Sequence, residues 1–364
     1  MSTNKMVRYA VIAVILLLGV YWSLASAQKE TENGYPNKGF LATADWLKRH
    51  KDDPRVVLVD VRTDKYFDGE VIPGAIRLPW SEFRYDDTAD NLGELFVGPT
   101  RAQEILGQHG IARTDTVVLY DSVKRDGGAT AAYFFWVLDV LGHSDKKVVD
   151  RGIDSWIDAG GDLARDPKQL DPILYQAPSD EIDSRKLETG DFIYKNLGDP
   201  YYRIIDVRSS AEYLGEKGTR DLHGNPLKLG HIPTAINIEY KQNWVDKESK
   251  AMKSYPELQE LYRGIDPNKG VVVYCASGRR SSFSYFVLRL MGFNDVITYE
   301  PSWKEWGNPA NFYPVETAEN KLTGGNLPGA GGKRSRSGAV QSSGTQSAQT
   351  SSGAPKGGYV SCGG

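Results

Sequence analysis

Cysteine and histidine are scarce in this chain of 364 residues, which holds two of the first and five of the second. Two cysteines do not make a disulfide framework, and the scattered histidines lack the spacing of zinc ligands. The sequence therefore predicts no metal site. A charge bias is also missing, because 44 basic residues stand against 47 acidic ones. We expect no nucleic-acid partner, since proteins that bind nucleic acid usually carry a basic excess.

The N-terminus has the pattern of a targeting segment. Lys5 and Arg8 precede an apolar run at residues 9–22, and Ala25-Ser-Ala27 supplies the small residues of a cleavage site. This order is typical of a secretory signal peptide. The run of 14 residues is shorter than the ~20 that a membrane-spanning helix needs. We predict that residues 1–27 are a signal peptide or, uncleaved, an N-terminal membrane anchor formed by residues 7–27. The chain is then exported, periplasmic or extracellular, and in the second case anchored to the inner membrane.

One pattern occurs twice along the chain. In each half, a strand ending in Asp-Val-Arg is followed by a tyrosine and then by a segment containing Ile-Pro-x-Ala-Ile. A β-branched strand then leads through a loop into an aromatic-rich helix that ends at glycine, a common C-cap. Strands that alternate with helices predict a mainly parallel sheet covered by helices on both faces. The matching pairs are 55–62 and 203–208, 71–76 and 231–236, 116–120 and 270–274, and 131–141 and 283–291.

The repeat predicts an α/β chain of two tandem domains, at residues 35–163 and 185–316. Residues 164–184 between them are rich in Pro, Asp and Gln and are predicted to be a linker. Residues 317–364 consist mainly of Gly, Ser, Thr and Gln, so we expect a disordered tail that cannot bury enough apolar surface to fold.

Cys275 is the main candidate for a reactive group. It follows the predicted strand 270–274 and begins the run Cys275-Ala-Ser-Gly-Arg-Arg280, just before a predicted helix. Backbone N–H groups at a helix N-terminus favour a nearby anion, and Arg279 and Arg280 add positive charge. Both effects favour the nucleophilic thiolate over the thiol. The alternative is a structural cysteine in the core, because free cysteine is often buried.

These features resemble the tandem-domain rhodaneses, the thiosulfate and 3-mercaptopyruvate sulfurtransferases. The resemblance covers residues 35–312 and rests on three signatures in order: the Asp-x-Arg strand end, Gly230-His-Ile-Pro-Thr-Ala235, and the Cys275 loop. It implies a catalytic C-terminal domain and an N-terminal domain without a nucleophile. Asp121 indeed stands in the first half where Cys275 stands in the second.

The resemblance implies that the Cys275 thiolate takes a sulfane sulfur from a small anionic donor and passes it, as a persulfide, to cyanide or a thiol. The loop formed by Ala276, Ser277, Gly278, Arg279 and Arg280 would bind the persulfide and the donor. By the same resemblance Arg208 would bind substrate and Asp206 would support the site, and no cofactor is needed. The structural alternatives are an ion pair of Arg208 with Asp206 or a loop carboxylate, and a turn or cap formed by Asp206. The cationic loop favours thiosulfate over 3-mercaptopyruvate. One departure is Glu212, which occupies a position where some family members have a second donor-binding arginine.

The sequence leaves two other functions open. A rhodanese-like chain can be a non-catalytic sulfur carrier or protein-binding module, although an intact Cys275 loop argues against it. A cysteine-based phosphatase of this fold needs Cys-x5-Arg, and here the sixth position after Cys275 is Ser281.

A second thiol, Cys362, lies in the predicted tail. A flexible chain of the intervening length has an end-to-end distance of roughly 35–40 Å. We therefore predict that Cys362 can reach Cys275, accept its sulfur or form a regulatory disulfide with it.

Overall fold

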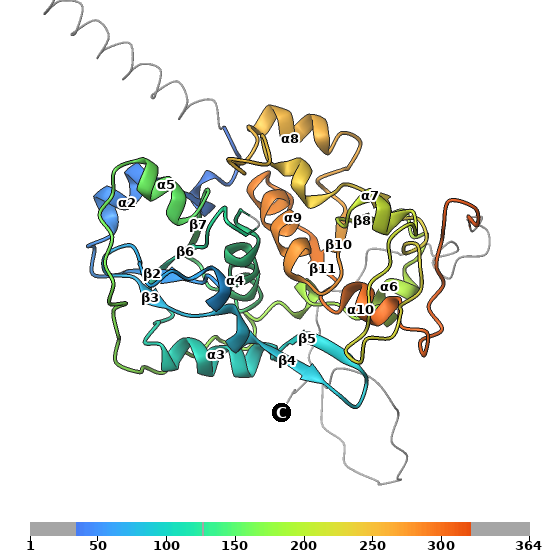
Figure 1. Ribbon diagram of the computed structural model, residues 1–364, viewed down its shortest axis with the longest axis horizontal. Coiled ribbons are helices and arrows are strands. Elements are labelled where there is room, and N and C mark those ends of the chain that lie inside the picture. Colours follow the sequence, from blue (N-terminus) through green and yellow to red (C-terminus); the bar gives the residue numbers. More distant parts are fainter. Residues whose placement is uncertain (1–33, 126, 322–364) are drawn as a thin grey trace, which may run out of the picture.

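The computed structural model describes residues 34–125 and 127–321, and these form two α/β domains joined through a shared core (Figure 1). The first domain holds a five-stranded sheet in the order β1-β7-β6-β2-β3, in which every pairing is parallel. Its strands are β1 Leu41–Ala42, β2 Val56–Asp60, β3 Ile76–Arg77, β6 Thr116–Tyr120 and β7 Lys146–Val149. Its helices are α2 Ala44–His50, α3 Gly98–Gln108, α4 Ala129–Val140 and α5 Ile153–Asp158, with 3-10 turns η1 Lys38–Phe40, η2 Asp64–Tyr66 and η3 Trp80–Phe83.

The second domain repeats this plan with a four-stranded parallel sheet in the order β11-β10-β8-β9. Its strands are β8 Tyr202–Asp206, β9 Ile236–Asn237, β10 Gly270–Tyr274 and β11 Val296–Thr298. Its helices are α6 Gly190–Lys195, α7 Ser210–Tyr213, α8 Tyr255–Leu261, α9 Arg279–Leu290 and α10 Ser302–Trp306, with 3-10 turns η4 Ser184–Lys186 and η5 Tyr240–Asn243. The predicted α/β class, with two mainly parallel sheets flanked by helices, is confirmed.

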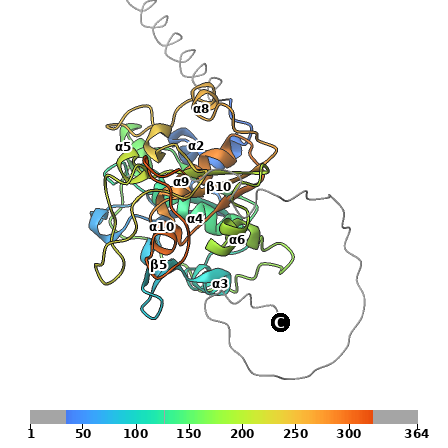
Figure 2. The same ribbon diagram turned by 90° about the vertical axis from the view of Figure 1, so that its right-hand side faces the viewer.

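The two domains meet along α4 and α9, which lie side by side at the centre of the molecule (Figures 1 and 2). Both helices are almost wholly buried, and the rings of Phe135 and Phe286 pack edge to face with centroids 4.9 Å apart. Side chains on a strand point alternately to the two faces of its sheet. In β10, Val271 and Val273 therefore join the core shared by the two domains, whereas Val272 and Tyr274 join a separate core behind the sheet.

A hairpin of β4 Arg84–Asp87 and β5 Leu92–Phe96 departs from the first domain's sheet. It extends under the second domain towards α10 (Figure 1). Its contacts place residues of the first domain beside the loop that carries Cys275.

The predicted linker is docked on the first domain for much of its length. Ala164 pairs with Val71, and the backbone N–H of Ile173 donates to the carbonyl of Gly107 at 2.9 Å. Tyr175 is buried, and its hydroxyl lies 2.9 Å from His143 Nδ1. Near the end of the second predicted domain, Glu316 pairs with His231. The domain limits 35–163 and 185–316 stay predictions.

The predicted signal peptide or anchor, residues 1–27, and nearly all of the predicted tail, including Cys362, lie outside the described residues. Among the helices of residues 34–125 and 127–321, none has the length and apolar character needed to cross a membrane. Export, membrane attachment and the role of Cys362 stay predictions.

Candidate active site

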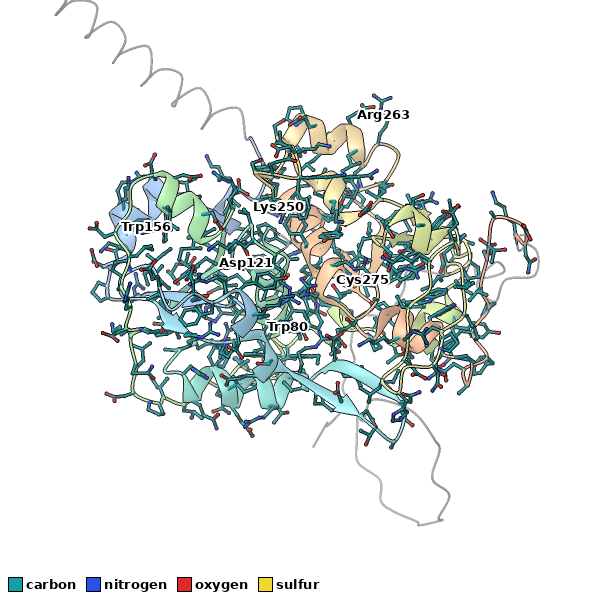
Figure 3. All side chains as sticks on the ribbon, viewed as in Figure 1. Trp80, Asp121, Trp156, Lys250, Arg263 and Cys275 are labelled. Carbon is teal, nitrogen blue, oxygen red and sulfur yellow. The ribbon has the colours of Figure 1, made fainter. Side chains whose placement is uncertain are left out.

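Cys275 directly follows β10, and the alternation of that strand directs its side chain into the core between the domains. The residue is 1% exposed and its thiol is free. Its backbone is fixed on both sides, because its N–H donates to Ser302 Oγ at 3.1 Å and its carbonyl accepts from the N–H of Trp303 at 3.1 Å. Figure 3 shows Cys275 in the half of the molecule formed by the second domain, near α9. The backbone that carries the Cys275 thiol is therefore fixed at the boundary between the two domains.

The loop after Cys275 turns sharply into α9. Gly278 has a φ of +88° and precedes the first helical residue, Arg279. A Cβ at this position would also lie 3.0 Å from the carboxylate of Glu300, so only glycine fits without strain. The Gly278 carbonyl accepts hydrogen bonds from the hydroxyls of Ser281 at 2.7 Å and Ser282 at 2.8 Å. The first N–H groups of a helix have no intrahelical partner and favour an anion, so the start of α9 at Arg279 is suited to an anion near Cys275.

Arg280 is the cation most firmly fixed beside the thiol. Its two terminal nitrogens each donate to one carboxylate oxygen of Glu212, both at 2.9 Å. Burial alone would raise the pKa of Glu212, but the hydrogen bonds and charge of Arg280 hold that pKa at about 2. The same carboxylate also accepts from the hydroxyl of Ser209 in a capping box at the start of α7. Glu212, noted in the sequence as a departure from the family, thus orients Arg280 and balances its charge.

Arg279 points into the boundary between the domains, where its guanidinium lies 5.9 Å from the centre of the Trp80 ring. Burial, together with the charges of Arg125 and Arg280, lowers the pKa of Arg279 to about 9. The side chain therefore keeps its charge at neutral pH. The two adjacent arginines are not equivalent, because Arg280 is paired within its own domain and Arg279 faces the first domain.

Asp206 and Arg208 form a buried unit with Tyr274. Arg208 is 1% exposed, donates to Asp206 Oδ2 at 2.6 Å and to the carbonyl of Gly230 at 2.7 Å, and stacks on Trp303 at 4.1 Å. The hydroxyl of Tyr274 donates to Asp206 at 2.6 Å. Since Tyr274 faces the core behind the sheet, this network braces the end of the strand that carries Cys275. The structure thus places Asp206 between Arg208 and Tyr274. A supporting role of Asp206 in the site and a substrate-binding role of Arg208 stay predictions.

Residues of the first domain reach the Cys275 loop, and the sequence reasoning missed them. Arg84 donates to the carbonyl of Ser277 at 2.7 Å and pairs with Glu300 at 2.9 Å. Glu94 accepts from the Ser277 hydroxyl at 2.8 Å and pairs with Lys304 at 2.8 Å. Both lie on the β4–β5 hairpin, which has no signature in the sequence that distinguishes it from an ordinary surface hairpin.

In the first domain, the carboxylate of Asp121 binds the backbone of the equivalent loop. Asp121 accepts hydrogen bonds from the backbone N–H groups of Gly128 and Thr130 at 3.0 Å and of Ala131 at 3.2 Å, at the start of α4. Burial raises the pKa of Asp121 to about 6 in spite of these donors. Figure 3 places Asp121 and Cys275 in the two halves of the molecule, on either side of its centre. The carboxylate occupies the N-terminus of α4, whereas in the second domain the corresponding helix, α9, follows the loop that carries Cys275.

No group of three or more His, Cys, Asp or Glu side chains that could hold a metal ion occurs within residues 34–125 and 127–321.

Comparisons with known proteins agree with this arrangement. The family model described as the rhodanese-like domain matches residues 43–159 and 189–309, once in each predicted domain. The chain is 30% identical over 297 residues to the thiosulfate sulfurtransferase of Corynebacterium glutamicum, covering 79% of this chain and 93% of the relative. It is 32% identical over 283 residues to the sulfur carrier protein TtuD of Thermus thermophilus, covering 76% of this chain and 96% of the relative.

The fold has solved counterparts as well. The wild-type structure of EanB superposes with a TM-score of 0.64 at 25% identity, over 77% of this chain and 69% of that one. The two matched domains and the relatives identify the class of the protein: it belongs to the tandem-domain rhodanese family. Within that family it is a transferase of the rhodanese sulfurtransferase type.

Proposed function

We propose that this protein moves a sulfane sulfur from a small anionic donor to a thiophilic acceptor through a persulfide on Cys275. The observation that carries the proposal is a free thiol at a strand end, directly before the N-terminus of α9 and beside the fixed cation of Arg280. A helix N-terminus and a guanidinium both stabilise an anion. The same groups can therefore stabilise the attacking thiolate and the persulfide that replaces it.

The chemistry proceeds in two steps. With thiosulfate, the Cys275 thiolate attacks the outer sulfur, the S–S bond of the donor breaks, and its electron pair leaves with sulfite. With 3-mercaptopyruvate, the C–S bond breaks and the enolate takes up a proton to give pyruvate. In the second step, cyanide or a thiolate attacks the outer sulfur of the persulfide and releases the Cys275 thiolate. Covalent catalysis of this kind predicts ping-pong kinetics.

Thiosulfate is the donor that the charges favour. Arg279 keeps its cation at the domain boundary, and the loop N–H groups add partial positive charge. Glu212 works against this preference, because it occupies the fork of Arg280. The preference for thiosulfate over 3-mercaptopyruvate should therefore be modest, and both donors need to be compared.

The alternatives have less support. A phosphatase would need a cation at the sixth loop position, but Ser281 stands there and its hydroxyl donates back to Gly278. A sulfur carrier, the role in the name of the Thermus thermophilus relative, would use the same Cys275 persulfide. It would differ in passing the sulfur to a partner protein rather than to cyanide or a small thiol.

The proposal is tested by initial rates of thiocyanate formation at varied donor and cyanide concentrations. We expect parallel double-reciprocal lines with thiosulfate, the pattern of a ping-pong mechanism. The kcat/KM for thiosulfate should exceed that for 3-mercaptopyruvate only modestly. Intersecting lines would require a ternary complex and contradict the persulfide. Turnover that appears only with a protein acceptor would favour the carrier.

A further inference from the structure

The β4–β5 hairpin of the first domain forms two hydrogen bonds with one residue of the Cys275 loop, Ser277. The Ser277 hydroxyl donates to Glu94 Oε2 at 2.8 Å, and the Ser277 carbonyl accepts from Arg84 at 2.7 Å. Ser277 lies two residues after Cys275. The hydroxyl and the carbonyl of Ser277 therefore both form hydrogen bonds with residues of the first domain. The sequence suggested that this hydroxyl binds the donor or the persulfide, but here it donates to Glu94.

Glu94 has an unusual backbone conformation for its residue type. Its φ is +63°, in the left-handed region that non-glycine residues rarely adopt. Strained conformations of this kind persist where the surroundings enforce them, and they cluster at functional sites. Here Glu94 lies at an irregularity in the register of the hairpin, and its backbone N–H donates to Asp86 Oδ1 at 2.8 Å. In this conformation its carboxylate contacts Ser277 and Lys304, both in the second domain.

The positive charges around Glu94 keep its carboxylate ionised, so that it can accept hydrogen bonds. Burial would raise the pKa of Glu94, but the hydrogen bond and charge of Lys304, with the Ser277 hydroxyl and Arg84, hold it at about 2. The carboxylate is therefore ionised throughout the neutral range. Lys304 is itself tied to the loop, since its backbone N–H donates to the carbonyl of Ala276 at 3.1 Å. Glu94 thus contacts the loop directly through Ser277 and indirectly through Lys304.

We propose that Glu94 is a positioning residue for sulfur transfer, which makes the first domain a working part of the active site even though it has no nucleophile. Glu94 holds Ser277, and through it sets the loop whose N–H groups face the anion at Cys275. This inference rests on the proposed function. It is specific to Glu94, because Arg84 also packs in the buried core and its loss would disturb folding.

A double-mutant cycle tests the proposal. Glu94→Ala and Ser277→Ala should each lower kcat for thiocyanate formation by at least ~10-fold with little change in the thiosulfate KM, since displaced catalytic groups act mainly on the chemical step. The double variant should be no worse than either single one, because both remove the same contact. Glu94→Gln should restore much of kcat, since its amide oxygen can still accept from Ser277.

Asn91→Ala is the matched control. Asn91 lies on the same hairpin, also has a positive φ, and also bridges the domains, donating to Asp221 at 2.5 Å. It contacts Asp221 rather than the Cys275 loop, so its loss should leave kcat within about twofold of wild type. An equal loss in Asn91→Ala would mean that the hairpin only docks the domains, and it would overturn the proposal. Two other results would also overturn it. One is a loss of kcat in the double variant that equals the product of the two single losses, and the other is an effect on KM alone.

A second readout does not depend on the donor. The rate of alkylation of Cys275 by iodoacetamide, followed by peptide mass mapping, should fall several-fold in Glu94→Ala and stay unchanged in Asn91→Ala. Removing a negative charge should by itself favour the thiolate and speed this reaction, so an unchanged or faster rate would refute a positioning role. If wild type formed no persulfide but Glu94→Ala still slowed alkylation, the proposed function would fail while the positioning of Cys275 by Glu94 would stand.

Discussion

Cys275→Ser should lower thiocyanate formation by at least ~1000-fold with either donor, because a serine hydroxyl is neither ionised nor able to hold a transferable sulfur. The backbone contacts of residue 275 with Ser302 and Trp303 do not involve the side chain, so the fold should remain. A new buried hydroxyl costs about 1–3 kcal/mol when it finds no partner. The measurements are initial rates and the urea midpoint of each protein.

The result is informative only when the variant is folded. A midpoint close to wild type with activity at background would assign the loss to the thiol. Residual turnover above a few per cent would show that another group carries sulfur. Cys362→Ser, measured in parallel with a thiol acceptor, reports how much of the sulfur passes through the tail.

Arg280→Ala should have the second largest effect, a fall of ~100-fold in kcat/KM for thiosulfate, the scale expected when one fixed charge-stabilising group is removed. Arg280 is the cation fixed beside Cys275, and Glu212 holds both of its terminal nitrogens. Lysine at this position should recover only part of the activity, because it cannot bind a carboxylate or an oxyanion with a planar fork.

The same substitution leaves Glu212 buried without its cation. Stability should fall by about 2 kcal/mol, less than for a fully buried pair because the Arg280 side chain is 20% exposed. The pKa of Glu212 is held at about 2, below its usual value, so the pair stabilises the fold above roughly pH 4.5 and loses this effect as the pH falls towards 2. Stability is therefore compared at pH 7, where the pair is fully ionised.

A double variant separates the two effects of Arg280. Glu212→Ala combined with Arg280→Ala removes both charges, so it should recover most of the stability without the activity. Recovery of both would mean that Arg280 acts only by neutralising Glu212, which would contradict a role in stabilising the thiolate or persulfide.

The strands that carry the site could be predicted closely from the sequence. Residues 116–120 and 270–274 were expected as strands from their β-branched runs, and β6 and β10 have these bounds. The helix after Cys275 was expected at 283–291, but α9 begins at Arg279. Arg279 to Ser282 have the polar character of a loop. They are helical because Gly278 makes the turn and its carbonyl accepts from Ser281 and Ser282.

The partners of the site residues could not be predicted. Glu212 and Arg280 are far apart in the sequence, and only the folding of the second domain brings them together. Glu94 and Ser277 belong to different domains, so their contact depends on how two complete domains pack. Sequence signatures mark the candidate nucleophile, because they lie in one short segment. The contacts of Glu212 and Glu94 form between segments whose spacing carries no periodic signal.

The most direct test of the central claim is the intact mass of the purified protein after incubation with thiosulfate in the absence of an acceptor. We predict a gain of one sulfur atom that maps to Cys275 and disappears, as thiocyanate, when cyanide is added. Cys275→Ser should show no gain. The absence of a gain in wild type with both thiosulfate and 3-mercaptopyruvate, or an equal gain in Cys275→Ser, would contradict sulfur transfer through a Cys275 persulfide.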